Sequence, residues 1–142
     1  MRRLVAIAPL VVLVAGCGGG GLSRAEYAAR ADAICAKYKR KLDALPKPAS
    51  PADVATFAAS ALPLVRAEAR ELRTLRPPKE ERDLAARWQR SNDEVVRAVD
   101  GLREAAASQD ANRITAALAT AQTVGGRSTT LSRALGMKAC AA

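Results

Sequence analysis

The chain begins to specify its fold at residues 22–45, LSRAEYAARADAICAKYKRKLDAL. Ser23 and Glu26 have the spacing of a capping box, in which each side chain bonds a free backbone N–H of the first helical turn. Leu22 can pack on Tyr27 across that turn. After Tyr27, apolar and small residues recur every three or four positions, which is the period of a helix with one buried face. The stretch predicts an amphipathic helix that begins at Ser23 and ends at the proline-rich segment that follows.

Three further segments carry the same pattern, so we expect an all-α fold. The expected helices cover residues 51–75, 79–107 and 111–135, with short loops between them. Pro63 lies inside the first of these, and because proline removes a backbone donor we expect this second helix to be kinked or split there. Four helices with short connections predict an antiparallel, up-down-up-down four-helix bundle over residues 23–142.

Composition excludes most familiar active sites. The 142 residues contain no histidine, the usual general base at neutral pH and the commonest metal ligand. The acidic run at residues 80–83, EERD, is better explained as the first turn of a helix, where carboxylates complement the helix dipole, than as a metal site. We therefore expect no enzymatic activity, no cofactor and no metal.

The N-terminus has the parts of an export signal. Residues 1–3 form a basic head, and an apolar run over residues 4–15 follows it. As a helix this run spans roughly 18 Å, which is too short for a hydrocarbon core of about 30 Å. We interpret residues 1–16 as a cleaved signal peptide rather than a membrane span.

The end of this signal, LVAGC at residues 13–17, resembles a bacterial lipobox. The resemblance implies that Cys17 receives a diacylglyceryl group on its sulfur and becomes the first residue of the mature protein. Residues 17–22 would then form the lipidated cysteine and a glycine-rich tether. The implied location is the outer face of the cell membrane, where the lipid anchors the exported body. Loss of Arg2 and Arg3 from a chain of net charge +9 leaves +7.

The two other cysteines are expected to form a disulfide. Cys35 and Cys140 remain as an even pair once Cys17 is lipidated, and disulfides are expected in exported proteins. In the predicted bundle, the tail after Gly136 must turn back along the first helix to reach Cys35. Cys35 lies roughly 18 Å along the helix from Ser23, and four extended residues span about 13 Å. The tail therefore reaches Cys35 if the fourth helix ends slightly above the base of the first, and under that condition the bundle and the bridge are compatible.

Basic residues gather near the first and second loops of the predicted bundle. The groups are Lys37, Lys39, Arg40, Lys41 and Lys47, and Arg66, Arg70, Arg73, Arg76, Lys79 and Arg82. An exported protein with few aromatic residues is a poor candidate for binding nucleic acid, so anionic lipid or an anionic wall polymer is the partner that these groups favour. Their spread over both ends of the bundle favours the simpler alternative, a solvated arginine-rich surface.

The body is similar to small, alanine- and arginine-rich helical lipoproteins of high-GC Gram-positive bacteria. The likeness rests on SRAEYAARADAIC at residues 23–35, LRTLRPP at 72–78 and ALGMKAC at 134–140. It implies a helical fold, export and the paired cysteines, and it assigns no functional residue.

Two functions remain open at this point. The first is a non-enzymatic binding or structural role at the cell envelope, and the alternative is a carrier or sensor that holds a small apolar ligand between the helices. A cavity lined by Tyr27, Tyr38, Phe57 and Trp88 would indicate the carrier, whereas a sealed interior would indicate the surface protein.

Overall fold

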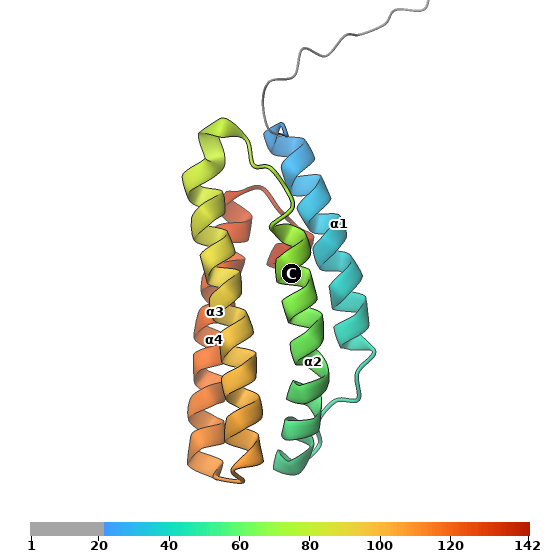
Figure 1. The fold of residues 1–142 in the computed structure, drawn as a ribbon, viewed down its shortest axis with the longest axis vertical. Coiled ribbons are helices and arrows are strands. Elements are labelled where there is room, and N and C mark those ends of the chain that lie inside the picture. The colour runs from blue at the N-terminus through green and yellow to red at the C-terminus, as the bar shows by residue number, and fades with distance from the viewer. Residues whose placement is uncertain (1–21) are drawn as a thin grey trace, which may run out of the picture.

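The computed structural model describes residues 22–142, which contain helices and loops and no strand (Figure 1). The α-helices are α1 (Arg24–Asp43), α2 (Pro51–Leu72), α3 (Arg82–Ala107) and α4 (Ala111–Ala134), and two 3-10 helices, η1 (Lys79–Glu81) and η2 (Ala139–Ala141), flank them. The predicted all-α four-helix fold is confirmed. The predicted signal peptide, the lipidation site at Cys17 and the glycines of the tether lie outside the described residues.

The helices begin where the sequence places capping residues. The Ser23 hydroxyl accepts a hydrogen bond from the Glu26 backbone N–H at 3.3 Å, and the Glu26 carboxylate accepts one from the Ser23 N–H at 2.9 Å. Ser50 and Asp53 form the same reciprocal pair at the start of α2. At the start of α4, the Asp110 carboxylate accepts two backbone N–H groups at 2.9 and 3.2 Å. These bonds satisfy donors that the first helical turn leaves free.

The second helix is not split at Pro63, because α2 continues through this residue. Pro63 lacks the N–H that would bond the carbonyl of Ala59. Both residues are exposed, so water can bond that carbonyl, and the cost of the missing bond is small.

Consecutive helices pack against one another, whereas α1 and α4 meet mainly through the C-terminal segment that contains η2. In Figure 1 the chain direction alternates from one helix to the next, and α1 ends well above the lower ends of the other three. The upper part of the molecule in Figure 1, beside α1, therefore contains all four α-helices. The lower part contains α2, α3 and α4.

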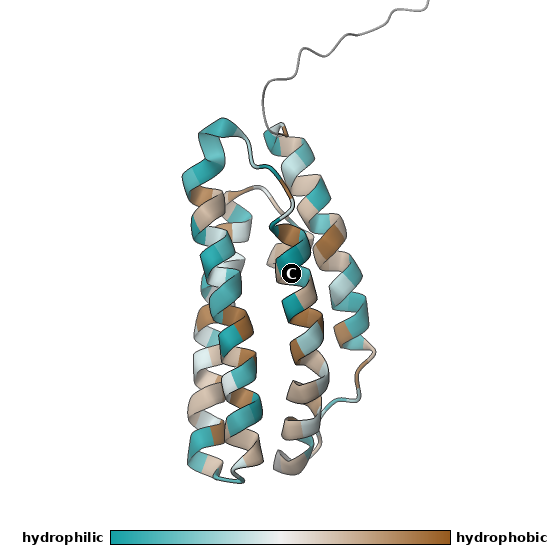
Figure 2. Cartoon of the chain, in the orientation of Figure 1, coloured by the Kyte–Doolittle hydropathy of each residue, from teal (hydrophilic) through white to brown (hydrophobic). Residues whose placement is uncertain are grey.

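Most of the buried apolar side chains form two separate groups, an upper and a lower one in the view of Figure 1. The upper core contains Tyr27, Ala28, Ala31, Ile34, Cys35, Tyr38, Leu72, Ala85, Trp88, Leu135 and Met137. The lower core contains Ala58, Leu102, Ala105, Ala106 and Ile114. In the upper core, the rings of Tyr27 and Trp88 meet edge to face with centroids 6.5 Å apart. Figure 2 shows the lower half of α2 as a mildly hydrophobic stretch, which reflects its many alanines.

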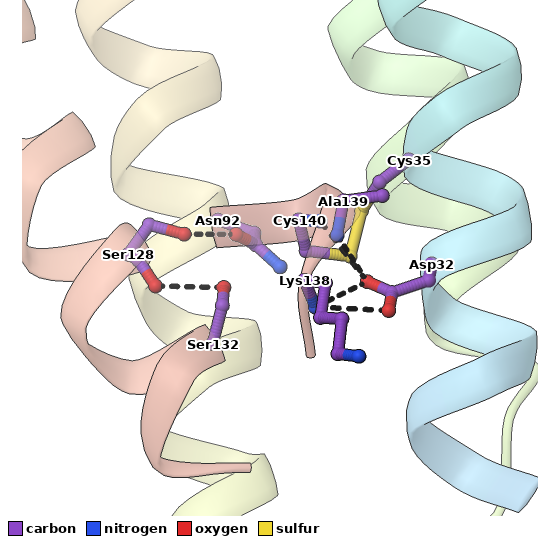
Figure 3. Close-up of a disulfide and its surroundings, with 8 residues drawn as sticks. All are labelled: Asp32, Cys35, Asn92, Ser128, Ser132, Lys138, Ala139 and Cys140. Atoms are coloured by element: carbon purple, nitrogen blue, oxygen red, sulfur yellow. Dashed lines mark hydrogen bonds between the residues drawn. A yellow bond between two sulfur atoms is a disulfide. The ribbon is translucent and has the colours of Figure 1, made fainter. Parts of the chain in front are cut away.

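The chain after α4 turns back onto α1, as the cysteine positions predict. Gly136 adopts the left-handed conformation, with φ of 79°, and the Met137 N–H donates to the Ser132 carbonyl at 3.0 Å. The backbone N–H groups of residues 138–140 then donate to the Asp32 carboxylate at 2.8 to 3.1 Å (Figure 3). Beside them, the Sγ atoms of Cys35 and Cys140 lie 2.06 Å apart and form a disulfide. We call residues 136–142 the C-terminal strap.

Candidate functional site

A cleft of about 310 Å³ lies at the level between the two cores, with residues of all four α-helices and the C-terminal strap around it. Its apolar lining includes Leu42, Val65, Leu72, Trp88, Val95 and Val96. Its polar lining consists of Lys39, Asp43, Glu68, Asn92, Ser128 and Thr129. The cleft exists because α1 and α4 do not pack directly, and the C-terminal strap, with Cys140, forms part of its wall.

Gly125 widens the cleft from the α4 side. A Cβ atom placed on Gly125 or on its neighbour Gly126 would meet no atom within 4 Å. The two glycines therefore neither allow a close helix approach nor break α4, which is continuous through both. Gly125 is half-buried and lines the cleft, whereas Gly126 is exposed.

Asn92 supplies a buried polar group with unused hydrogen-bonding capacity. The Ser128 hydroxyl donates to Asn92 Oδ1 at 2.7 Å, which fixes the amide. Asn92 Nδ2 is buried and has no hydrogen-bond partner among residues 22–142. In Figure 3 this nitrogen points away from Ser128 and toward the C-terminal strap. A buried unpaired donor costs about 1–3 kcal/mol, so an acceptor atom of a ligand would gain by bonding it.

Among the ionisable residues of the cleft lining, Glu68 is the one that has no ion-pair or hydrogen-bond partner within residues 22–142. Burial raises the pKa of its carboxyl to about 7, and no ion pair or hydrogen bond to its side chain is found in the described part of the chain. The other charged residues of the lining, Lys39 and Asp43, pair with each other at 3.3 Å at the exposed rim. At neutral pH the Glu68 carboxyl is therefore divided between its neutral and charged forms, and it can donate or accept a proton in a hydrogen bond.

The aromatic residues do not surround one cavity, contrary to the carrier arrangement that the sequence suggested. Only Trp88 lines the cleft, and its ring is 1% exposed. Tyr27 lies in the upper core, and the Tyr38 hydroxyl donates to Glu71 at 3.0 Å. Phe57 is half-buried on α2 and is not part of the lining.

Ion pairs between helices use part of the predicted basic groups. Lys37 pairs with Glu71 between α1 and α2, and its ammonium group, as the strongest influence, lowers the pKa of that carboxyl. Between α2 and α3, Arg73 pairs with Asp93 and Arg66 with Asp100. These basic residues thus fix neighbouring helices against each other, which reduces the free positive charge of both groups.

The acidic run at residues 80–83 lies at the junction of η1 and α3. Glu81 pairs with Arg24 at 3.2 Å across to the start of α1. No group of three or more acidic or cysteine side chains in residues 22–142 is arranged to hold a metal ion. None of the helices in these residues is both long enough and apolar enough to cross a membrane.

Sequence analysis missed Glu68 and Asn92, the two polar residues of the cleft lining on which the candidate site depends. Glu68 follows Val65 by three positions and precedes Leu72 by four, so it lies on the apolar stripe of α2. Asn92 follows Trp88 by four positions on α3. A polar residue at an apolar position of the helical period was the signal that could have identified each of them.

Comparison with known proteins finds no matching family model, no significantly similar curated sequence and no significantly similar solved structure.

Proposed function

We propose that the protein is a lipid-anchored cell-envelope protein whose helical body binds a small molecule with an apolar part in the cleft. The anchor is inferred from the lipobox-like residues 13–17 and the signal pattern before them. Binding is inferred from one observation, a cleft between two cores in which the buried Asn92 amide nitrogen has no hydrogen-bond partner within residues 22–142.

The dimensions of the cleft support a small ligand. A volume of about 310 Å³ is at the lower end of the range for small-molecule sites, which is about 300–1,000 Å³. Such sites combine mostly apolar walls with a few polar groups that orient the ligand. Val65, Leu72 and Val96 provide such walls here, and Glu68 and Asn92 provide the polar groups.

The groups around the cleft support binding rather than catalysis. The hydroxyl of Ser128 donates to an amide oxygen, which cannot act as a general base for a nucleophile. Cys35 and Cys140 are bonded to each other, so neither presents a free thiol to the cleft.

Trp88 provides a direct test of binding because it is the only tryptophan of the chain and it lines the cleft. We expect octanol, octylamine or octanoate to change its fluorescence in a saturable way in the purified, oxidised protein. The variant Gly125→Leu, which fills the cleft, should abolish the change. The variant Gly126→Leu on the exposed side of the same helix should retain it. Absence of saturable binding by all three probes would overturn the proposed binding function.

The anchor is tested separately in the producing cells. We expect Cys17 to carry the lipid at the N-terminus of the mature protein, as measured by intact mass analysis. The variant Cys17→Ser should appear in the soluble fraction rather than the membrane fraction. A mature protein that keeps Met1, or an unmodified Cys17, would overturn the proposed anchor and leave the cleft unaffected.

A further inference from the structure

We infer that the ligand of the cleft carries a protonated amine and that Glu68 binds this amine, an inference that rests on the proposed binding function. The carboxyl group lies on α2 between the apolar positions Val65 and Leu72, and all three residues line the cleft. A carboxylate in such a place forms strong, charge-assisted hydrogen bonds with an ammonium group.

The charged groups around Glu68 favour a cation over an anion. On α1, Lys39 and Asp43 neutralise each other at the rim. Burial and the hydrogen bond to Glu71 mainly raise the pKa of the Tyr38 hydroxyl, and the charge of Glu68 has the smallest effect on it. On α2 itself, Glu71, three residues after Glu68, is paired with Lys37. The residues that α3 and α4 contribute to the lining are all neutral.

The charge of this site is opposite in sign to the net charge of the whole chain. The sequence has a net charge of +9, yet the unpaired ionisable group of the cleft lining is a carboxyl. A ligand carboxylate would meet repulsion from Glu68 and would find no unpaired lysine or arginine in the lining. An amine would find a partner there, so the cleft selects against the anions that the basic surface attracts.

The register of α2 and α3 places Glu68 away from Asn92. The pairs Arg66–Asp100 and Arg73–Asp93 set Glu68 level with residue 98 of α3. Asn92 is six residues from that level, roughly 9 Å along the helix axis. The amine at Glu68 and the acceptor for Asn92 would therefore lie at opposite ends of the ligand, with its apolar part between them.

The test compares octylamine, octanol and octanoate, which share one apolar chain and differ in charge. At pH 7.5 we expect octylamine to bind about tenfold more tightly than octanol, and octanoate to bind most weakly. The variant Glu68→Gln should remove the advantage of octylamine over octanol. The control Glu104→Gln removes the same charge from an exposed position of α3 and should preserve the advantage.

Calorimetry provides a second readout that does not depend on a variant. Because Glu68 has a pKa of about 7, amine binding at pH 7 should release protons as the carboxyl ionises, and octanol binding should not. The number of protons released on binding is obtained from calorimetric titrations with the amine in buffers that differ in ionisation enthalpy.

The outcomes separate this inference from the function on which it rests. If no probe binds, the proposed binding function fails. If octanol or octanoate binds as tightly as octylamine, or if Glu68→Gln keeps the preference, the binding function stands and the amine assignment is overturned.

Discussion

The upper and lower parts of this molecule are built from the same kind of amphipathic helix but are stabilised in different ways. The upper part contains the tyrosines, the tryptophan, the disulfide and the C-terminal strap. The lower part contains three helices around a core of three alanines, Leu102 and Ile114. A buried alanine contributes much less hydrophobic free energy than a buried leucine or tryptophan, so the lower core is the weaker of the two.

This difference explains where the cleft lies. Large side chains fill the upper core, and the small side chains of the lower core let α3 pack closely against α2 and against α4. Between these levels α1 ends, and α4 presents Gly125 instead of a side chain. The cleft lies at this level because fewer side chains fill the space between α1 and α4 there. The predictions below test this contrast, beginning with the largest expected effect.

The disulfide should make the largest contribution, and it acts on the upper part. The double variant Cys35→Ala and Cys140→Ala removes the closure of a loop with a sequence separation of 105 residues. In the chain-entropy model this lowers the free energy of unfolding by about 4–5 kcal/mol. Urea denaturation of the variant and of the oxidised protein measures the difference. A loss below about 1 kcal/mol would mean that the unfolded chain is already compact or that the bond is strained.

The two cores should respond differently to truncation. We expect Trp88→Ala in the upper core to lower the free energy of unfolding by about 3–5 kcal/mol, and Leu102→Ala in the lower core by about 2–3 kcal/mol. The smaller loss follows because Leu102 is surrounded by alanines on helices that can move closer together. Equal losses, measured by thermal and urea unfolding, would contradict the proposed weakness of the lower core.

The contrast between the two parts also shows which features of the structure could be predicted from the sequence. The helix starts were predictable because a capping box, such as Ser23 with Glu26, is a local pattern. The pairing of Cys35 with Cys140 was predicted because lipidation of Cys17 would leave these two cysteines as an even pair in an exported protein. Both conclusions needed no knowledge of how the helices approach one another.

The cleft could not be predicted, because it depends on distances between helices that a sequence pattern does not contain. Helical periodicity places Val65 and Leu72 on the inner face of α2, but it does not give the separation of α1 from α4. The apolar stripe of α2 marks Glu68 as an unusual position, but without that separation the sequence does not show that a cleft lies beside it or beside Gly125. The uninterrupted course of α2 past Pro63 likewise depended on the exposure of the Ala59 carbonyl.

Glu68 should make stability depend on pH. Its pKa in the folded protein is about 7, above its ordinary value of 4.5, because burial disfavours the charged form. Between pH 4.5 and about 7, the folded state keeps a proton on Glu68 that the unfolded state releases. The free energy of unfolding therefore falls as the pH rises through this range. Above about pH 7 the contribution of Glu68 no longer changes with pH. We expect Glu68→Gln to be more stable than the natural chain by about 1–3 kcal/mol at pH 8, allowing for solvent screening.

The measurement is urea unfolding of both proteins at pH 4.5, 6 and 8. The gain from Glu68→Gln should be near zero at the lowest pH and should grow toward pH 8. Glu104→Gln, on an exposed position, should show no such dependence. A gain of equal size at all three values would show that the substitution acts through packing rather than through the charge of Glu68.

The smallest predicted change in the free energy of unfolding comes from two glycine variants that test whether the cleft is open beside α4. Gly125→Ala and Gly126→Ala should each raise the free energy of unfolding by about 0.5–1 kcal/mol, because alanine loses less backbone freedom than glycine in a helix. Neither new Cβ meets an atom within 4 Å, so the two gains should agree. If Gly125→Ala gains less than Gly126→Ala, or loses stability, α4 lies closer to its neighbours in solution and the cleft is closed at this level. Equal gains, combined with loss of octylamine binding in Gly125→Leu but not in Gly126→Leu, would show that the space beside Gly125 is open and is the space that the ligand occupies.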